Sequence, residues 1–189
     1  MTTKETTGRE IALDVLTEVL ENGGFIHTSL SRALLKYQYL EKQERAFITR
    51  LTDGTVERLL TLDAAINACS KTRTEKMKPF IRTLLRMSAY QILYMDRIPD
   101  SAACNEAVKL AKKRRFAQLS GFVNGVLRKL CSQKNALAWP DREKEPVRFL
   151  SVRYSMPEWI VRRWMEESGA EKTEVMLKAL LEKRPLTIR

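Results

Sequence analysis

The chain has 189 residues, enough for one medium domain or for a domain with a smaller appendage. Its 44% hydrophobic residues can form a buried core, and its 7 glycines and 6 prolines are too few for a fold of many short strands. The net charge is +11. Three widely spaced cysteines and one histidine exclude a zinc knuckle, and the lack of any long apolar run excludes a membrane span. The cysteine usage fits a reducing cytoplasm.

The positive charge is concentrated in the middle of the chain. Residues 61–140 contain 15 Lys and Arg against 5 Asp and Glu, whereas the two signs are nearly balanced in residues 1–60 and 141–189. A protein that is basic only for solubility would carry its charge more evenly. The clustering therefore favours a surface that binds a polyanion.

Helical periodicity dominates the first seventy residues. A capping box, Thr7-x-x-Glu10, opens the first predicted helix, and Asn22-Gly23-Gly24 ends it. A short second helix follows, whose leucines, Leu35 among them, are predicted to face inward. A third helix is predicted over residues 41–69, with a kink at Asp53-Gly54.

Three further helices are predicted in the basic middle segment. Pro79 suits the first turn of the fourth helix, Ile98-Pro99 ends it, and Asp100 or Ser101 is predicted to cap the fifth. In the sixth helix Asn124-Gly125 would usually indicate a hairpin turn. The apolar stripe continues in phase on both sides of this pair, so a continuous helix is predicted.

The last quarter of the chain is also predicted to be helical. Residues 135–145 are predicted to be a linker, and a second capping box, Ser155-x-x-Glu158, opens another helix. A final helix is predicted to end at Pro185, after which Leu186–Arg189 resembles the start of a strand. The predicted fold class is therefore all-α, with a bundle of six helices over residues 6–135 and two or three more after it.

The strongest candidate for a binding site is the basic run Lys109–Arg115. Lys109, Lys112 and Lys113 recur at helical spacing, so they share one side of the fifth helix. Like charges on one side repel each other, and phosphates would offset that cost. The alternative is a solvated charged surface, as most charge runs are, but the absence of acidic residues from 107–140 favours a ligand.

Further candidate residues lie on the polar sides of neighbouring helices. Gly121 and Gly125 would let another backbone approach closely, whether a packed helix or an RNA strand. Asn124 lies beside them and could read a base or hold a loop carbonyl. The predicted RNA-binding residues are Arg9, Arg82, Arg86, Lys109, Lys112, Lys113, Arg114, Arg115, Asn124, Arg128 and Lys129.

No catalytic or metal-binding residues are predicted. His27 stands alone and is interpreted as a cap or surface residue, and the aromatic residues at helical spacing are assigned to the core. The sequence has neither a Gly-rich phosphate loop nor zinc-ligand spacing, and its paired carboxylates lie among basic residues rather than in a predicted cleft.

Four stretches of the chain together resemble the NusB fold family. Their order and spacing both fit, and the similarity covers roughly residues 6–135. The stretches are Leu84–Tyr94, Arg97–Pro99, Asn105–Lys112 and Phe122–Arg128.

The resemblance implies one of two kinds of protein. One is the free-standing antitermination factor NusB, which would end near Lys134. The other is the Sun/Fmu/RsmB family of ribosomal RNA cytosine-5 methyltransferases, which carry this domain at the N-terminus. The segment Tyr154–Val161 resembles the bridge into the catalytic part of that second group. Two domains are therefore expected: a NusB-like RNA-binding domain over 1–135, and a linker with the start of the methyltransferase helical region over 136–189.

The second group implies an RNA-recruiting fragment of a small-subunit ribosomal RNA methyltransferase in the cytoplasm. The family's catalytic domain binds S-adenosylmethionine and attacks cytosine with a cysteine thiolate. Neither that cofactor nor that nucleophile is expected here, because none of Cys69, Cys104 and Cys131 adjoins a proline or a Gly-rich loop. Ribosomal RNA is the expected partner. A protein partner, an antitermination role or a pure protein-docking role are the alternatives.

Overall fold

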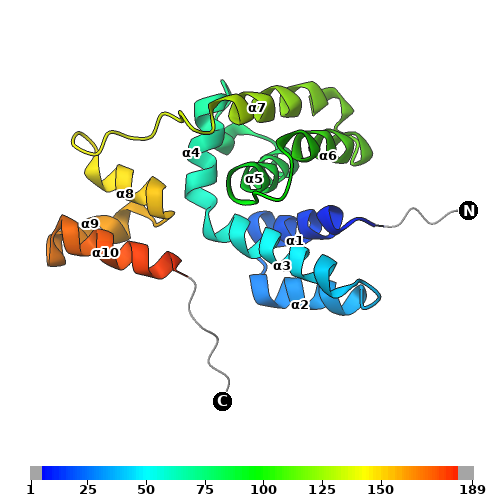
Figure 1. The fold of residues 1–189 in the computed structure, drawn as a ribbon, viewed down its shortest axis with the longest axis horizontal. Helices are drawn as coiled ribbons and strands as arrows, with labels where there is room; N and C mark the ends of the chain where they lie inside the picture. The colour runs from blue at the N-terminus through cyan, green and yellow to red at the C-terminus, as the bar shows by residue number, and fades with distance from the viewer. Residues whose placement is uncertain (1–5, 183–189) are drawn as a thin grey trace, which may run out of the picture. The chain divides into compact units, whose positions relative to one another are not determined.

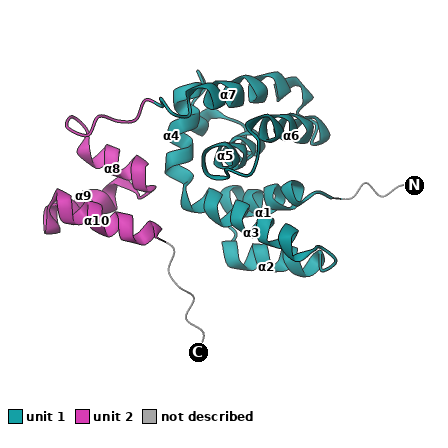
Figure 2. Ribbon diagram, viewed as in Figure 1, with its two compact units in different colours: residues 1–137 teal, residues 138–189 magenta. Residues whose placement is uncertain are grey.

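The computed structural model describes residues 6–182, and every regular element within that range is a helix (Figure 1). The predicted all-α fold class is therefore confirmed. The chain divides into two compact units, residues 1–137 and 138–189 (Figure 2). The predicted helix end at Pro185 and the predicted strand at Leu186–Arg189 lie outside the described residues.

The first unit contains seven of the described α-helices and two short 3-10 helices. The second unit contains three. The bounds in the first unit are α1 Gly8–Asn22, α2 Ile26–Lys36, α3 Lys42–Glu57, α4 Leu59–Cys69, η1 Thr74–Lys76, α5 Pro79–Tyr94, α6 Asp100–Lys113, η2 Ala117–Leu119 and α7 Ser120–Gln133. Those in the second are α8 Pro146–Tyr154, α9 Glu158–Ser168 and α10 Ala170–Leu181.

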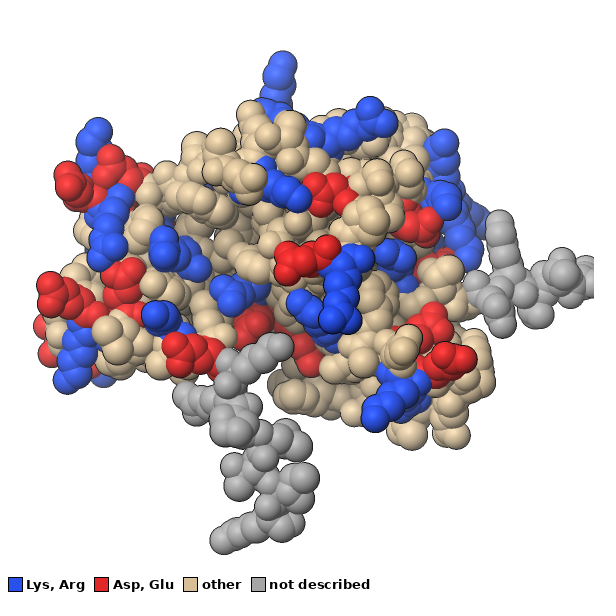
Figure 3. Space-filling model, in the orientation of Figure 1, with Lys and Arg blue, Asp and Glu red and all other residues tan. Residues whose placement is uncertain are grey.

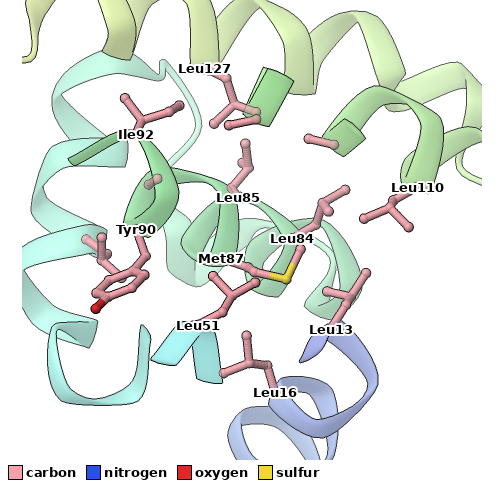
Figure 4. Close-up of a cluster of buried hydrophobic side chains, with 14 of the residues drawn as sticks. Leu13, Leu16, Leu51, Leu84, Leu85, Met87, Tyr90, Ile92, Leu110 and Leu127 are labelled. Atoms are coloured by element: carbon pink, nitrogen blue, oxygen red, sulfur yellow. The ribbon is translucent and has the colours of Figure 1, made fainter. Parts of the chain in front are cut away.

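The helix α5 forms the centre of the first unit. It packs against α1, α3, α4, α6 and α7, and eleven of its sixteen residues are buried. Figure 4 shows Leu84, Leu85 and Met87 of α5 between Leu16 of α1 and Leu127 of α7. Each fully buried leucine stabilises the fold by roughly 1.5–3 kcal/mol, so α5 holds the surrounding helices in place.

The third predicted helix is in fact two helices, and the prediction of a kink at Asp53-Gly54 is wrong. The chain leaves helical geometry at Arg58, where φ is −98° and ψ is 17°, so that α3 ends at Glu57 and α4 begins at Leu59. Gly54 stays helical and serves packing instead, because a Cβ there would lie 2.0 Å from the hydroxyl oxygen of Tyr90.

The N-terminal caps predicted for two helices of the first unit can be compared with the structure. The capping box at Thr7 is confirmed: the Glu10 N–H donates to Thr7 Oγ1 at 3.3 Å, and the Thr7 N–H donates to Glu10 Oε2 at 3.1 Å. The predicted cap of α6 is wrong, because Asp100 is already helical and Pro99 takes the capping position without a side-chain hydrogen bond. The fixed φ of proline suits this position, so a polar cap is dispensable.

The second capping box, Ser155-x-x-Glu158, is also wrong. The sequence reasoning missed the helix α8, and Ser155 ends that helix in the left-handed conformation with φ of 53°. Pro157 then occupies the capping position of α9, without a side-chain cap. Because Ser155 closes one helix, it does not open the next.

The two units differ in the size of their cores. The first unit buries a continuous apolar cluster, whereas the second buries fully only Leu150, Val161 and Leu177 among the hydrophobic residues in its described part. Leu35, predicted to face inward, is 64% exposed. The prediction fails because α2 turns Leu30 toward the core, and a residue five positions later points elsewhere.

Candidate functional site

The basic run lies at the C-terminal end of α6, where the helix ends in a strained turn. The Phe116 N–H donates to the Ala111 carbonyl oxygen at 2.8 Å, which requires Arg115 to adopt the left-handed conformation with φ of 68°. Glycine is the usual residue there, and a side chain costs roughly 1–2 kcal/mol. The presence of an arginine here instead of glycine makes its side chain a candidate for a functional role.

Three cations of this run already bind carboxylates. Lys113 Nζ lies 2.5 Å from Glu10 Oε1, and Lys109 Nζ lies 2.7 Å from Glu106 Oε1. Lys113 and Glu10 join α6 to α1, whereas the second pair lies within α6. Arg114 also joins α6 to α1, donating to both carboxylate oxygens of Asp14 at 2.6 and 2.8 Å. These cations fix the end of α6 and are partly neutralised.

Lys112 and Arg115 are different, because neither has an ion-pair partner among residues 6–182. Both are exposed. Lys112 also lines an open hollow of about 600 Å³ between α1 and α6, together with Thr7, Glu10, Glu106, Lys109, Leu110 and Lys113. In Figure 3, Lys and Arg gather at the edge where Figure 1 places the junction of α6 and α7, whereas the two signs are interspersed elsewhere on this face.

Glu10 lines this hollow from α1, whereas its neighbour Arg9 contacts α5 and α3. Burial alone would raise the pKa of Glu10, but the hydrogen bonds from Lys113 and from the Thr7 backbone hold it below its usual value. Glu10 therefore stays ionised and keeps Lys113 bound at neutral pH. Burial lowers the pKa of Arg9, which donates to Gln91 Oε1 at 2.7 Å and lies 5.3 Å above the Phe47 ring.

Arg82 and Arg86 do not lie on this surface. Their side chains are 20% and 11% exposed, and both bind carboxylates. Arg86 donates to both oxygens of Asp63 at 2.7 and 2.8 Å, and Arg82 pairs with Glu21. These four residues join α5 to α1 and α4, so Arg82 and Arg86 both make contacts that stabilise the fold.

The helix α7 has glycine at two exposed positions, Gly121 and Gly125. Apart from the adjoining residues and the backbone of α7 itself, no atom of the described chain lies within 4 Å of where a Cβ at Gly121 or Gly125 would be, so packing of another helix of this chain does not explain them. Arg128 Nε donates to Asn124 Oδ1 at 3.3 Å across this surface. Lys129 lies apart, with Nζ 3.5 Å from the Ala68 carbonyl oxygen.

The structure thus brings the cations of α6 together and separates them from Arg82 and Arg86. Sequence reasoning missed the carboxylates that bind these cations, above all Glu10 and Asp14. The motif Thr7-x-x-Glu10 indicated a cap but gave no sign of Lys113, which lies more than one hundred residues further along the chain. The left-handed conformation of Arg115 had no sequence signal either.

Two of the three cysteines lie next to each other in the first unit. Cys104 Sγ and Cys131 Sγ lie 3.7 Å apart between α6 and α7. Burial and the Cys104 thiol raise the pKa of Cys131 to about 12, so this thiol is protonated at neutral pH. Within the described range, no group of three or more His, Cys, Asp or Glu side chains is placed to hold a metal ion.

The helices of residues 6–182 include none that is long and apolar enough to cross a membrane.

Comparison with known proteins matches residues 6–132 to the NusB family. The chain is 32% identical over 133 residues to the transcription antitermination protein NusB of Anaeromyxobacter dehalogenans, covering 70% of this chain and 93% of that protein. It is 36% identical over 171 residues to the probable ribosomal RNA small subunit methyltransferase B of Bacillus subtilis. That match covers 90% of this chain, which spans only 37% of the relative's length.

A solved structure shows the same fold. The NusB of T. maritima superposes with a TM-score of 0.59 at 24% identity, covering 68% of this chain and 93% of that one. The match to the methyltransferase relative therefore extends beyond the NusB region into the second unit.

Proposed function

Since this chain belongs to the NusB family, we propose that it binds RNA and recruits ribosomal RNA for a longer cytosine-5 methyltransferase. The observation that carries the RNA-binding part is the pair of exposed, unneutralised cations, Lys112 and Arg115, at the strained end of α6. Phosphates are the ligands that such cations hold, through release of counterions. Asn124 and Arg128, on the open surface of α7, are the candidates to read shape or bases.

The extent of the sequence similarity favours the methyltransferase over an antitermination factor. The NusB relative accounts for 70% of the chain, and the methyltransferase relative for 90%. The antitermination role is the second candidate, because the chain spans 93% of the NusB relative. In either role the protein would act in the cytoplasm.

S-adenosylmethionine belongs to this proposal only as a cofactor of the longer protein. The described residues are helical and provide no doubly wound sheet on which the resemblance would place that cofactor. The contribution of this chain would be to hold the RNA. Its own residues would therefore act on binding and orientation.

Replacing Lys112 and Arg115 by Gln tests the proposal without breaking an ion pair. Affinity should fall by a similar factor for a small-subunit ribosomal RNA fragment and for a scrambled RNA of equal length, because phosphate binding is independent of sequence. The slope of log affinity against log salt should become shallower by roughly 0.7 for each phosphate that the variant no longer neutralises. Filter binding across a salt series measures both quantities.

The matched control is Lys172→Gln with Lys178→Gln, which removes the same charge from exposed positions of α10. Its affinity and salt slope should stay those of the wild type. Arg128→Ala should instead change the discrimination between the two RNAs. Equal losses in the test and control variants would mean that RNA responds only to net charge, and no loss in either would contradict the proposed surface.

A further inference from the structure

The helix α2 is the least covered helix of the first unit. Within its fully described span Leu30 is the one buried residue, and α2 packs mainly against α1 and α3. Three large apolar side chains on and beside it are exposed: Phe25 by 82%, Leu35 by 64% and Tyr39 by 66%. An apolar surface of this kind on a small unit marks a site of interaction.

Of these three residues Leu35 lies within α2, whereas Phe25 precedes the helix and Tyr39 follows it. Within the helix, Arg32 and Leu35 are three residues apart, so their side chains are neighbours on the surface of α2. Phe25 occupies the capping position of α2 without making a side-chain cap. The N-terminal capping position of a helix is usually occupied by a small polar residue, but here it is occupied by Phe25, whose ring is exposed.

A groove of about 270 Å³ lies between α1 and α2, and Arg32 is among the residues that line it. Its apolar lining includes Ile11 and Val15 from α1, which are 2% and 4% exposed, and Ala33 from α2. Polar residues form its two edges: Asp14 and Glu18 on α1, and Ser29, Arg32 and Lys36 on α2. The groove therefore has an apolar floor between charged edges.

The two edges differ in how their charges are satisfied. On α1, Asp14 binds Arg114, and Glu18 Oε2 accepts a hydrogen bond from the Asn22 amide at 3.0 Å. On α2, neither Arg32 nor Lys36 has a carboxylate partner in the part of the chain that the structure describes, although Lys36 lies 5.3 Å from the Tyr37 ring centre. The positive edge therefore carries two cations without a carboxylate partner, whereas on the negative edge Glu18 alone has no cation partner among the described residues.

We propose that the groove between α1 and α2 binds a protein partner through an amphipathic helix with acidic residues along one side. The apolar side of that helix would lie on Val15 and Ala33 and against Leu35, and its carboxylates would pair with Arg32 and Lys36. Anchors at helical spacing in an apolar groove are a common mode of protein recognition.

Two other occupants fit the surface less well. If two copies of this chain packed α2 to α2 about a two-fold axis, Arg32 of one copy would lie close to Arg32 of the other, and the like charges would repel. RNA phosphates would meet the carboxylate of Glu18, which has no cation partner among the described residues. An amphipathic helix avoids both difficulties, because it can turn its acidic side toward Arg32 and Lys36 alone.

The test uses three synthetic helical peptides of about four turns. They share one leucine stripe and carry Glu, Gln or Lys beside it, and each is titrated into the whole 189-residue chain by amide NMR. The Glu peptide should bind about tenfold more tightly than the Lys peptide, since two surface ion pairs change from attraction to repulsion. The shifted amides should be those of α1 and α2 around Val15 and Ala33.

Substitutions of exposed residues then separate charge from contact. Arg32→Glu with Lys36→Glu should reverse the preference between the Glu and Lys peptides, and Leu35→Ser should weaken binding of all three. Lys172→Glu with Lys178→Glu, on α10, is the control with the same charge change and should alter nothing. The Lys112→Gln and Arg115→Gln variant should keep its peptide binding, which distinguishes this surface from the proposed RNA surface.

Three outcomes would overturn the proposal. The first is equal affinity for all three peptides, and the second is shifts confined to other helices. The third is that a ribosomal RNA fragment shifts the α2 amides, or that dilution does so through loss of a dimer sensitive to Leu35→Ser. Either result would assign the surface to RNA or to a second copy instead.

Discussion

At the residue scale, identical substitutions at two glycines should have opposite effects. Gly54→Ala should lower the free energy of unfolding by about 1–3 kcal/mol, because the new methyl group would collide with the Tyr90 ring. Gly125→Ala should raise it by about 0.5–1 kcal/mol, because alanine favours the helix and meets open space. Urea unfolding measures both values, and a gain at Gly54 would contradict the packing described for that position.

The sequence alone predicts some of the relations between the site residues but not others. The spacing of Lys109, Lys112 and Lys113 correctly predicts that they share one side of a helix, since helix geometry fixes that relation locally. Spacing could not predict that Glu10 and Asp14 bind two of the cations in the run, because those contacts depend on how α1 packs against α6. Whether the eleven predicted residues bind RNA stays a prediction.

At the scale of elements, local signals predicted helices better than their ends. Periodicity correctly predicted that α7 continues through Asn124-Gly125, because the apolar residues on both sides share one core. It failed between α3 and α4, where a break at Arg58 leaves the apolar pattern almost in phase. It also missed α8, a helix of nine residues with only two buried, whose pattern is too short to stand out.

The ion-pair cluster that joins α1, α4 and α5 should be sensitive to loss of one member. Asp63→Ala would leave the nearly buried Arg86 without its two-oxygen partner, and should lower the free energy of unfolding by about 2–3 kcal/mol. Glu75→Ala is the control, because its pair with Arg73 is well exposed and should contribute less than about 0.5 kcal/mol. Equal effects in urea unfolding would mean that the cluster does not stabilise this junction.

At the scale of the whole molecule, brief trypsin digestion should separate the two units. Lys144 lies between α7 and α8 and its side chain is 83% exposed, so the first cut within residues 6–182 should follow it. The first unit should then persist because of its continuous core, whereas the second, with three fully buried hydrophobic residues among those described, should be degraded. Mass spectrometry identifies the fragments, and Lys144→Gln should delay the cut. Early cleavage within α6 would refute this order of stability.

The contact between Gly54 and Tyr90 also has a consequence for how related sequences vary. A side chain at position 54 and a large ring at position 90 would occupy the same space. The two positions, 36 residues apart, should therefore change together across the family: where 54 carries alanine or a larger residue, 90 should carry one smaller than tyrosine. Family members that keep both a side chain at 54 and an aromatic ring at 90 must have shifted α3 away from α5.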